Sequence, residues 1–143
     1  MSIAFRLVLH LPRDAATVPV ARRLLGQALG TLGVEDGCRD DISLILTEAC
    51  ANVIEHALDT DDYEITIDVT GARCVIHVVN AGAAVDPADL TGDGVASLDE
   101  HGRGLQIIRS LADELYLTPA LSGGLVLQAV TTLRWTAGAP AFR

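Results

Sequence analysis

Two stretches of alternating apolar residues, joined by a short turn, constrain the fold of this 143-residue chain most. Apolar residues occupy every second position over 63–69, and the same alternation recurs over 74–79. Side chains of a strand point alternately to its two faces, so each stretch predicts a strand with one face on a core. Thr70-Gly71-Ala72 lies between them and predicts a tight turn, and therefore an antiparallel hairpin.

The apolar spacing of the remaining segments predicts the other elements. They are a strand over 3–9, helices over 18–32, 39–57 and 105–115, and strands over 116–118 and 125–135. Residues 81–101 are rich in Gly, Asp and Ala and predict a long loop. This order predicts an α/β two-layer sandwich, a mixed, mostly antiparallel sheet with helices on one face. We expect one domain over residues 1–135 and a frayed tail over 136–143.

Composition limits the classes of partner. Half of the residues are hydrophobic but only 3% are aromatic, so the core must be aliphatic. The net charge of −9 would repel nucleic acid and anionic membranes, and would attract a basic protein surface. No stretch approaches the ~20 apolar residues of a spanning helix. The first apolar run is too short for a signal peptide, so we expect a cytoplasmic protein.

The choice of basic and sulfur residues excludes several chemistries. All ten basic residues are arginine. A Walker-type phosphate loop, a eukaryote-like protein kinase and Schiff-base chemistry each require a lysine. The three cysteines are odd in number and form no C-x-x-C pair, which argues against a disulfide framework or a zinc site.

Glu48, Asn52 and His56 lie four residues apart on the predicted helix over 39–57. This spacing places them on one face, beside the apolar stripe. A carboxylate and an amide oxygen at the edge of a core suit a hard cation such as Mg²⁺, which prefers oxygen ligands. The same spacing also describes an ordinary solvated helix face, so the row alone leaves both interpretations open.

Two glycine-containing segments follow this helix. Asn80-Ala81-Gly82 ends the second strand of the hairpin, and the segment His101-Gly102-Arg103-Gly104-Leu105 opens the helix predicted near residue 105. Glycines ahead of a helix start offer free backbone N–H groups and a favourable dipole for phosphate. A Gly-x-Gly segment is also common as a simple tight turn.

Taken in order, these motifs resemble the GHKL superfamily of histidine-kinase-like ATPases. The stretch DISLILTEACANVIEHA over 41–57 is similar to bacterial anti-sigma-factor serine-protein kinases, and the resemblance covers residues 1–135. It implies a domain that binds ATP and Mg²⁺, phosphorylates a serine of an anti-sigma antagonist protein and sequesters a sigma factor. It also implies a homodimer.

The resemblance assigns roles to the residues on the phosphate side. Glu48 would be the general base and Asn52 the Mg²⁺ ligand. Gly102 and Gly104 would cradle phosphate, with Arg103 and Leu105 in the same nucleotide-binding segment. Residues 86–101 would form a lid.

The adenine side departs from the family pattern. Asn80 stands where the family has an adenine-binding aspartate, and Gly82 would let the backbone approach the nucleotide. Ala84 occupies a second glycine position, and Leu125 a position where threonine is frequent. A neutral amide accepts a weaker hydrogen bond than a carboxylate does, so we expect reduced ATP affinity.

Two other functions stay open. The first is a catalytically weak or inactive protein-binding module of the same fold. The second is the ATP-binding domain of a split histidine kinase, whose phosphoacceptor histidine would come from another chain. Gyrase-like and Hsp90-like clamps are disfavoured because they require further domains.

Overall fold

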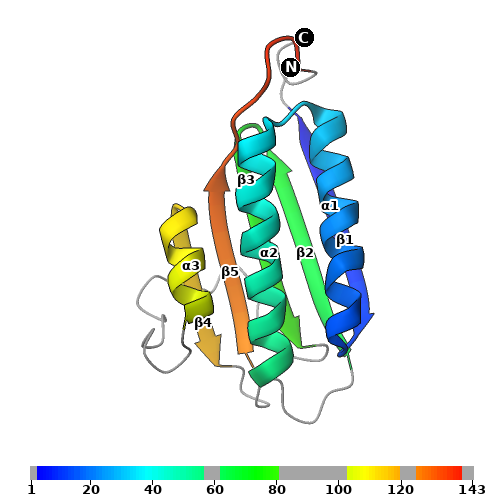
Figure 1. Cartoon of the computed structure of the whole chain (residues 1–143), viewed down its shortest axis with the longest axis vertical. Coiled ribbons are helices and arrows are strands. Elements are labelled where there is room, and N and C mark those ends of the chain that lie inside the picture. Colours follow the sequence, from blue (N-terminus) through cyan, green and yellow to red (C-terminus); the bar gives the residue numbers. More distant parts are fainter. Residues whose placement is uncertain (1–2, 57–61, 81–102, 120–124, 140–143) are drawn as a thin grey trace.

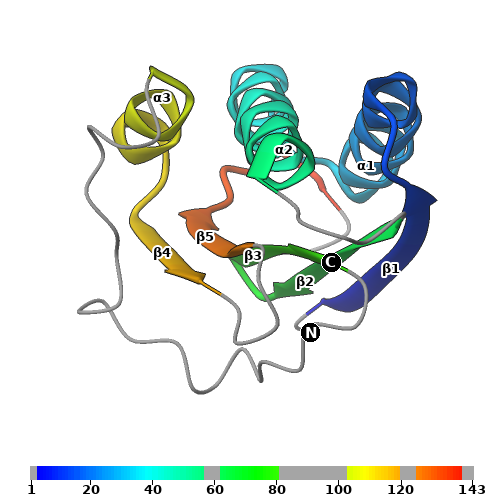
Figure 2. The same cartoon turned by 90° about the horizontal axis from the view of Figure 1, so that it is seen from below.

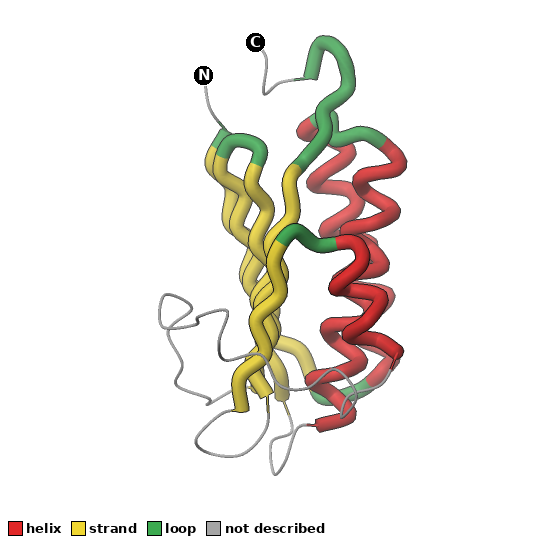
Figure 3. Tube along the Cα trace, turned by 90° about the vertical axis from the view of Figure 1, so that its left-hand side faces the viewer, coloured by secondary structure: helices red, strands yellow, loops and turns green. Residues whose placement is uncertain are grey.

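The computed structural model describes residues 3–56, 62–80, 103–119 and 125–139. A sheet forms one layer and the helices form the other (Figure 3). The elements in chain order are β1 (Ala4–Pro12), a 3-10 turn (Ala15–Thr17), α1 (Val18–Leu32), α2 (Asp36–His56), β2 (Asp62–Thr70), β3 (Arg73–Asn80), α3 (Arg103–Leu111), β4 (Glu114–Pro119) and β5 (Leu125–Thr132). None of the described helices is both long and apolar enough to cross a membrane.

The five strands follow the order β1-β2-β3-β5-β4, and each pairing between neighbours is antiparallel. Helices α1, α2 and α3 lie side by side on one face of this sheet, with α2 in the middle (Figure 2). The predicted two-layer sandwich with a mostly antiparallel sheet is therefore confirmed.

The alternating residues of β2 face the helices. Tyr63, Ile65, Ile67 and Val69 are all fully buried. Thr70 pairs with Arg73 across a two-residue loop, and Gly71 has a φ of 57°. This left-handed conformation favours glycine, which confirms the predicted hairpin and accounts for its turn.

Helix α1 spans the predicted residues 18–32 and ends at Gly33. The φ of Gly33 is 95°, and its N–H donates to the carbonyl oxygens of Leu29 and Gly30 at 3.1 Å. A left-handed glycine that satisfies the last carbonyls is a common helix terminator.

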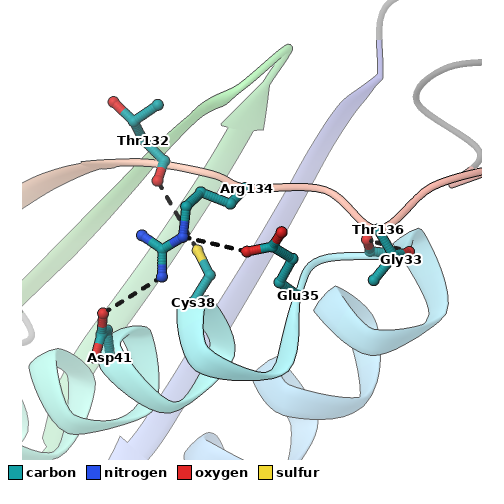
Figure 4. A network of polar contacts seen from close by, with 7 residues as sticks. All are labelled: Gly33, Glu35, Cys38, Asp41, Thr132, Arg134 and Thr136. Atoms are coloured by element: carbon teal, nitrogen blue, oxygen red, sulfur yellow. Dashed lines mark hydrogen bonds and ion pairs between the residues drawn. The ribbon is translucent and has the colours of Figure 1, made fainter.

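Helix α2 begins at Asp36, three residues before its predicted start at Arg39, and its first turn is tied to the chain beyond β5 (Figure 4). Arg134 Nε lies 3.3 Å from Glu35 Oε2, and a terminal guanidinium nitrogen of Arg134 lies 3.7 Å from Asp41 Oδ2. The Glu35 N–H also donates to the Arg134 carbonyl at 2.9 Å. These contacts fix the N-terminal end of α2 beside the end of β5.

The predicted helix over 105–115 is wrong at its C-terminal end. Helix α3 stops at Leu111, and Leu115 is a buried residue of β4 opposite Ala129. The cause is long-range, because the Asp113 N–H donates to the Val130 carbonyl at 2.8 Å and Asp113 Oδ2 accepts from the Thr132 hydroxyl at 2.7 Å. Strand β5 thus captures the chain immediately after α3.

The C-terminal segment is ordered further than its composition suggested. Strand β5 ends at Thr132, and Trp135 forms an isolated bridge with Val34. The Thr136 N–H donates to the Gly33 carbonyl at 2.8 Å, and Ala139 is only 3% exposed. Thr136, the first residue of the segment expected to fray, therefore bonds to the residue that ends α1, and residues 140–143 lie outside the described residues.

The three thiols, Cys38, Cys50 and Cys74, are free and buried in the aliphatic core. They behave as small apolar residues.

Candidate functional site

The helices and strands that carry the described parts of the predicted motifs meet at one end of the molecule, the lower end in Figure 1. Helix α2 and strand β3 both run toward this end, and α3 and β5 both begin there (Figure 1). Val79 of β3 pairs with Val126 of β5, so the last residue of β3, Asn80, lies close to the first residue of β5, Leu125. An antiparallel sheet brings these distant segments together because its strand ends alternate between two edges.

Glu48 lies against the first turn of α3. A Cβ atom placed on Gly104 would be 2.8 Å from Glu48 Oε2 and 3.9 Å from Glu48 Cδ. The side chain of Glu48 is half-buried between the two helices. The structure therefore brings together the helix motif and the second glycine segment, which the sequence placed far apart.

Asn52 lies one turn beyond Glu48 on the same face of α2. It is 5% exposed, and its Oδ1 is buried with no hydrogen-bond partner in the part of the chain that the structure describes. Leaving a buried polar atom unpartnered costs about 1–3 kcal/mol. Such an acceptor suits a ligand that brings a cation or a donor, and this orphaned oxygen fits the magnesium site that the spacing indicated.

The other predicted site residues on α3 are placed differently. The side chain of Leu105 is fully buried in the core, so only its backbone is available to a ligand. Arg103 is the first residue of α3 and is exposed. Gly102 lies outside the described residues, as does the predicted lid over 86–101.

The adenine side is described only in part. Asn80 is the last residue of β3 and pairs with Tyr63 through the backbone, and its side chain is outside the described set. Gly82 and Ala84 also lie outside the described residues, as does the side chain of His56. Leu125, at the start of β5, is 4% exposed and belongs to the hydrophobic core.

A hollow of about 360 Å³ lies on the other side of α2, toward α1, and no pattern in the sequence predicts it. Its lining is mostly apolar: Ala15, Val18, Pro19, Arg22, Thr47, Ala51, Ile54 and Glu55. These residues carry no motif, because a groove between two helices depends on how the helices pack. Glu48 and Asn52 do not line this hollow, so the candidate chemistry is confined to the α3 side of α2.

Together, the two-layer fold, the Glu48 carboxylate against the start of α3 and the unpartnered oxygen of Asn52 match the class of nucleotide-binding domain that the sequence resembles. Comparison with known proteins makes this specific. A model of the histidine kinase-like ATPase domain matches residues 11–131, and the chain belongs to that family. ATP is the nucleotide that membership of this family implies.

The chain is also similar to named relatives. Serine-protein kinase RsbW of Bacillus mycoides (strain KBAB4) is 28% identical over 124 residues, which cover 78% of this chain and 76% of that protein. The protein of the same name from Bacillus cereus (strain ATCC 10987 / NRS 248) gives the same identity and coverage. The resemblance to serine-protein kinases of this kind is thereby confirmed.

Two solved structures share the fold. The RsbU and RsbW domains of Rv1364c from Mycobacterium tuberculosis match with a TM-score of 0.68 and 18% identity, over 93% of this chain and 35% of that chain. The SiaB-SiaC complex from Pseudomonas aeruginosa matches with a TM-score of 0.61 and 16% identity, over 87% of this chain and 88% of that chain. At these identities the two structures establish the fold alone.

Proposed function

We propose that this protein is a cytoplasmic ATP-dependent serine-protein kinase whose substrate is an anti-sigma antagonist protein and which also sequesters a sigma factor. The observation that carries the proposal is the Glu48 carboxylate against the first turn of α3, one helical turn from the unpartnered oxygen of Asn52. The similarity to serine-protein kinase RsbW supports the reaction. The partner class is the one that the resemblance of residues 41–57 to anti-sigma-factor kinases implies.

In this proposal Glu48 is the general base. Its carboxylate accepts the proton of a serine hydroxyl while the serine oxygen bonds to the γ-phosphorus of ATP and the bond from that phosphorus to the bridging oxygen of ADP breaks. Asn52 Oδ1 would hold Mg²⁺, which when bound spreads the negative charge of the phosphates. The backbone of the segment from Gly102 to Leu105 would bind phosphate at the start of α3.

The decisive experiment is phosphotransfer with Mg²⁺-ATP and a candidate antagonist protein. We expect phosphoserine to form, and we expect Glu48→Gln to reduce its rate by about 10²–10⁴-fold while ATP binding persists. Glu55→Gln is the matched control, since Glu55 is on the same helix but lines the hollow toward α1. A Glu48→Gln variant that transfers phosphate at the wild-type rate would disprove the assignment.

A second candidate function is a protein-binding module with little use of ATP. It is favoured by Leu125, which is buried in the core at the start of β5, close to the end of β3 where Asn80 stands. An apolar side chain there offers no hydrogen bond to adenine, and Asn80 offers only a neutral acceptor.

Calorimetry with Mg²⁺-ATP separates the two candidates. Micromolar binding supports the kinase, whereas no binding at millimolar ATP supports the module. Asn80→Asp should tighten ATP binding if the end of β3 recognises adenine. An unchanged affinity would remove Asn80 from the site.

A further inference from the structure

Gly104 has no side chain, and the Glu48 carboxylate lies close to the place that a Cβ atom at residue 104 would take. A Cβ atom at residue 104 would be 2.8 Å from Glu48 Oε2, and real Cβ atoms essentially never approach another heavy atom within 3.0 Å. Any residue other than glycine at this position therefore forces a movement of α3 or of the Glu48 side chain.

The Glu48 side chain is the part that would move. Helix α3 is anchored by Leu105 and Ile108, both of which are fully buried. The oxygen of Glu48 is instead the far end of a flexible side chain, so moving it costs less than moving the packed helix. The residue at position 104 thus affects the position of the Glu48 carboxylate more than it affects the packing of α3.

We propose that Gly104 is a positioning residue for the Glu48 carboxylate. Because glycine has no Cβ atom, the Glu48 carboxylate can lie where it accepts the proton of the substrate serine. This inference rests on the proposed kinase function and deepens it. In this role Gly104 acts through Glu48. A glycine that lets phosphate approach the backbone would instead act on the nucleotide.

The two roles predict different kinetics for Gly104→Ala. If Gly104 positions Glu48, kcat for phosphotransfer falls by about 10²-fold, as small misplacements of a reacting group can cause, and the Kd for Mg²⁺-ATP stays within about twofold. In a Glu48→Ala background the same change has no further effect on the residual rate. A rise of tenfold or more in the ATP Kd in both backgrounds would overturn the proposal in favour of phosphate approach.

A stability cycle tests the contact even if no antagonist is phosphorylated. In the Glu48→Ala background, Gly104→Ala should raise Tm by up to about 2 °C, because alanine forms helix better than glycine. In wild type this gain should disappear, because the new methyl group displaces Glu48. Equal shifts in the two backgrounds would show that residues 104 and 48 are not coupled, and would refute the positioning role whether or not the kinase function holds.

Gly26→Ala is the matched control for this cycle. Gly26 lies in α1, and a Cβ atom there would meet no atom within 4 Å. Its effect on Tm should be the same with and without Glu48. If the effect of the control on Tm also differs between the two backgrounds, the cycle reports a general effect of removing Glu48, and the specific contact is rejected.

Discussion

Asn52 buries an amide oxygen that accepts no hydrogen bond within the described part of the chain. It lies on the helix that packs through Ala49 and Val53 into the core, where an apolar side chain would meet no penalty. A protein selected only for stability would not keep an unpartnered oxygen at this depth. The cost is understandable if the oxygen is used when a ligand binds.

Replacing Asn52 with leucine should therefore separate stability from binding. We expect Asn52→Leu to leave the free energy of unfolding unchanged or to raise it by about 1 kcal/mol, since the desolvated amide is removed. The same variant should lose Mg²⁺-dependent ATP binding. Urea unfolding and calorimetry measure the two effects.

Thr47→Val provides the control for this pair of measurements. The Thr47 hydroxyl donates to the Ser43 carbonyl at 2.8 Å on the α1 side of the helix, so its loss should lower stability slightly and leave ATP binding intact. An Asn52→Leu protein that is clearly less stable yet binds ATP normally would show that Asn52 is a structural residue.

At the scale of elements, the sequence predicted what depends on local spacing. The bounds of α1, the turn at Gly71 and the inward face of β2 follow from periodicity and backbone conformation, and all were predicted correctly. The end of α3 was not, because Leu111 and Leu115 are four residues apart and fit a helix equally well. Only the pairing of β4 with β5 excludes that continuation, and pairing partners are distant in sequence.

The same limit applies to the candidate site. The spacing of Glu48 and Asn52 was enough to place them on one helix face. The clearance between Glu48 and Gly104 was not predictable, because it depends on the distance between two packed helices. The burial of the Leu105 side chain follows from the same packing.

Gly26 inside α1 and Gly33 at its C-cap have opposite requirements, and they give a prediction for this element. Gly26 is inside the helix with open space at its Cβ position, so Gly26→Ala should raise the free energy of unfolding by about 0.5–1 kcal/mol. Gly33 has a φ of 95°, so Gly33→Ala should lower it by about 1 kcal/mol or more. Chemical denaturation of both variants measures the difference, and two changes of the same sign would contradict the assigned helix end.

At the scale of the whole molecule, one sheet topology serves both the core and the site. Strands and helices meet in an aliphatic layer, while their ends bring the motif-bearing segments to one edge (Figure 1). The core includes thiols on two different elements, Cys50 on α2 and Cys74 on β3. Burial, as the main cause, raises the pKa of each thiol from 9.0 to about 12.

These thiols predict how stability depends on pH. A folded-state pKa above the unfolded one means that the folded protein holds its protons more tightly, so this contribution is complete below pH 9 and is lost as pH rises toward 12. Each thiol should lower the free energy of unfolding by about 1.4 kcal/mol per pH unit in that window. Urea unfolding under reducing conditions between pH 8 and pH 9 measures the start of this loss, below the range where Tyr63, whose pKa burial also raises, begins to add to it. Cys74→Ala should lower stability at every pH but reduce the slope, whereas an unchanged slope would show that this thiol ionises as readily in the folded protein as in the unfolded chain.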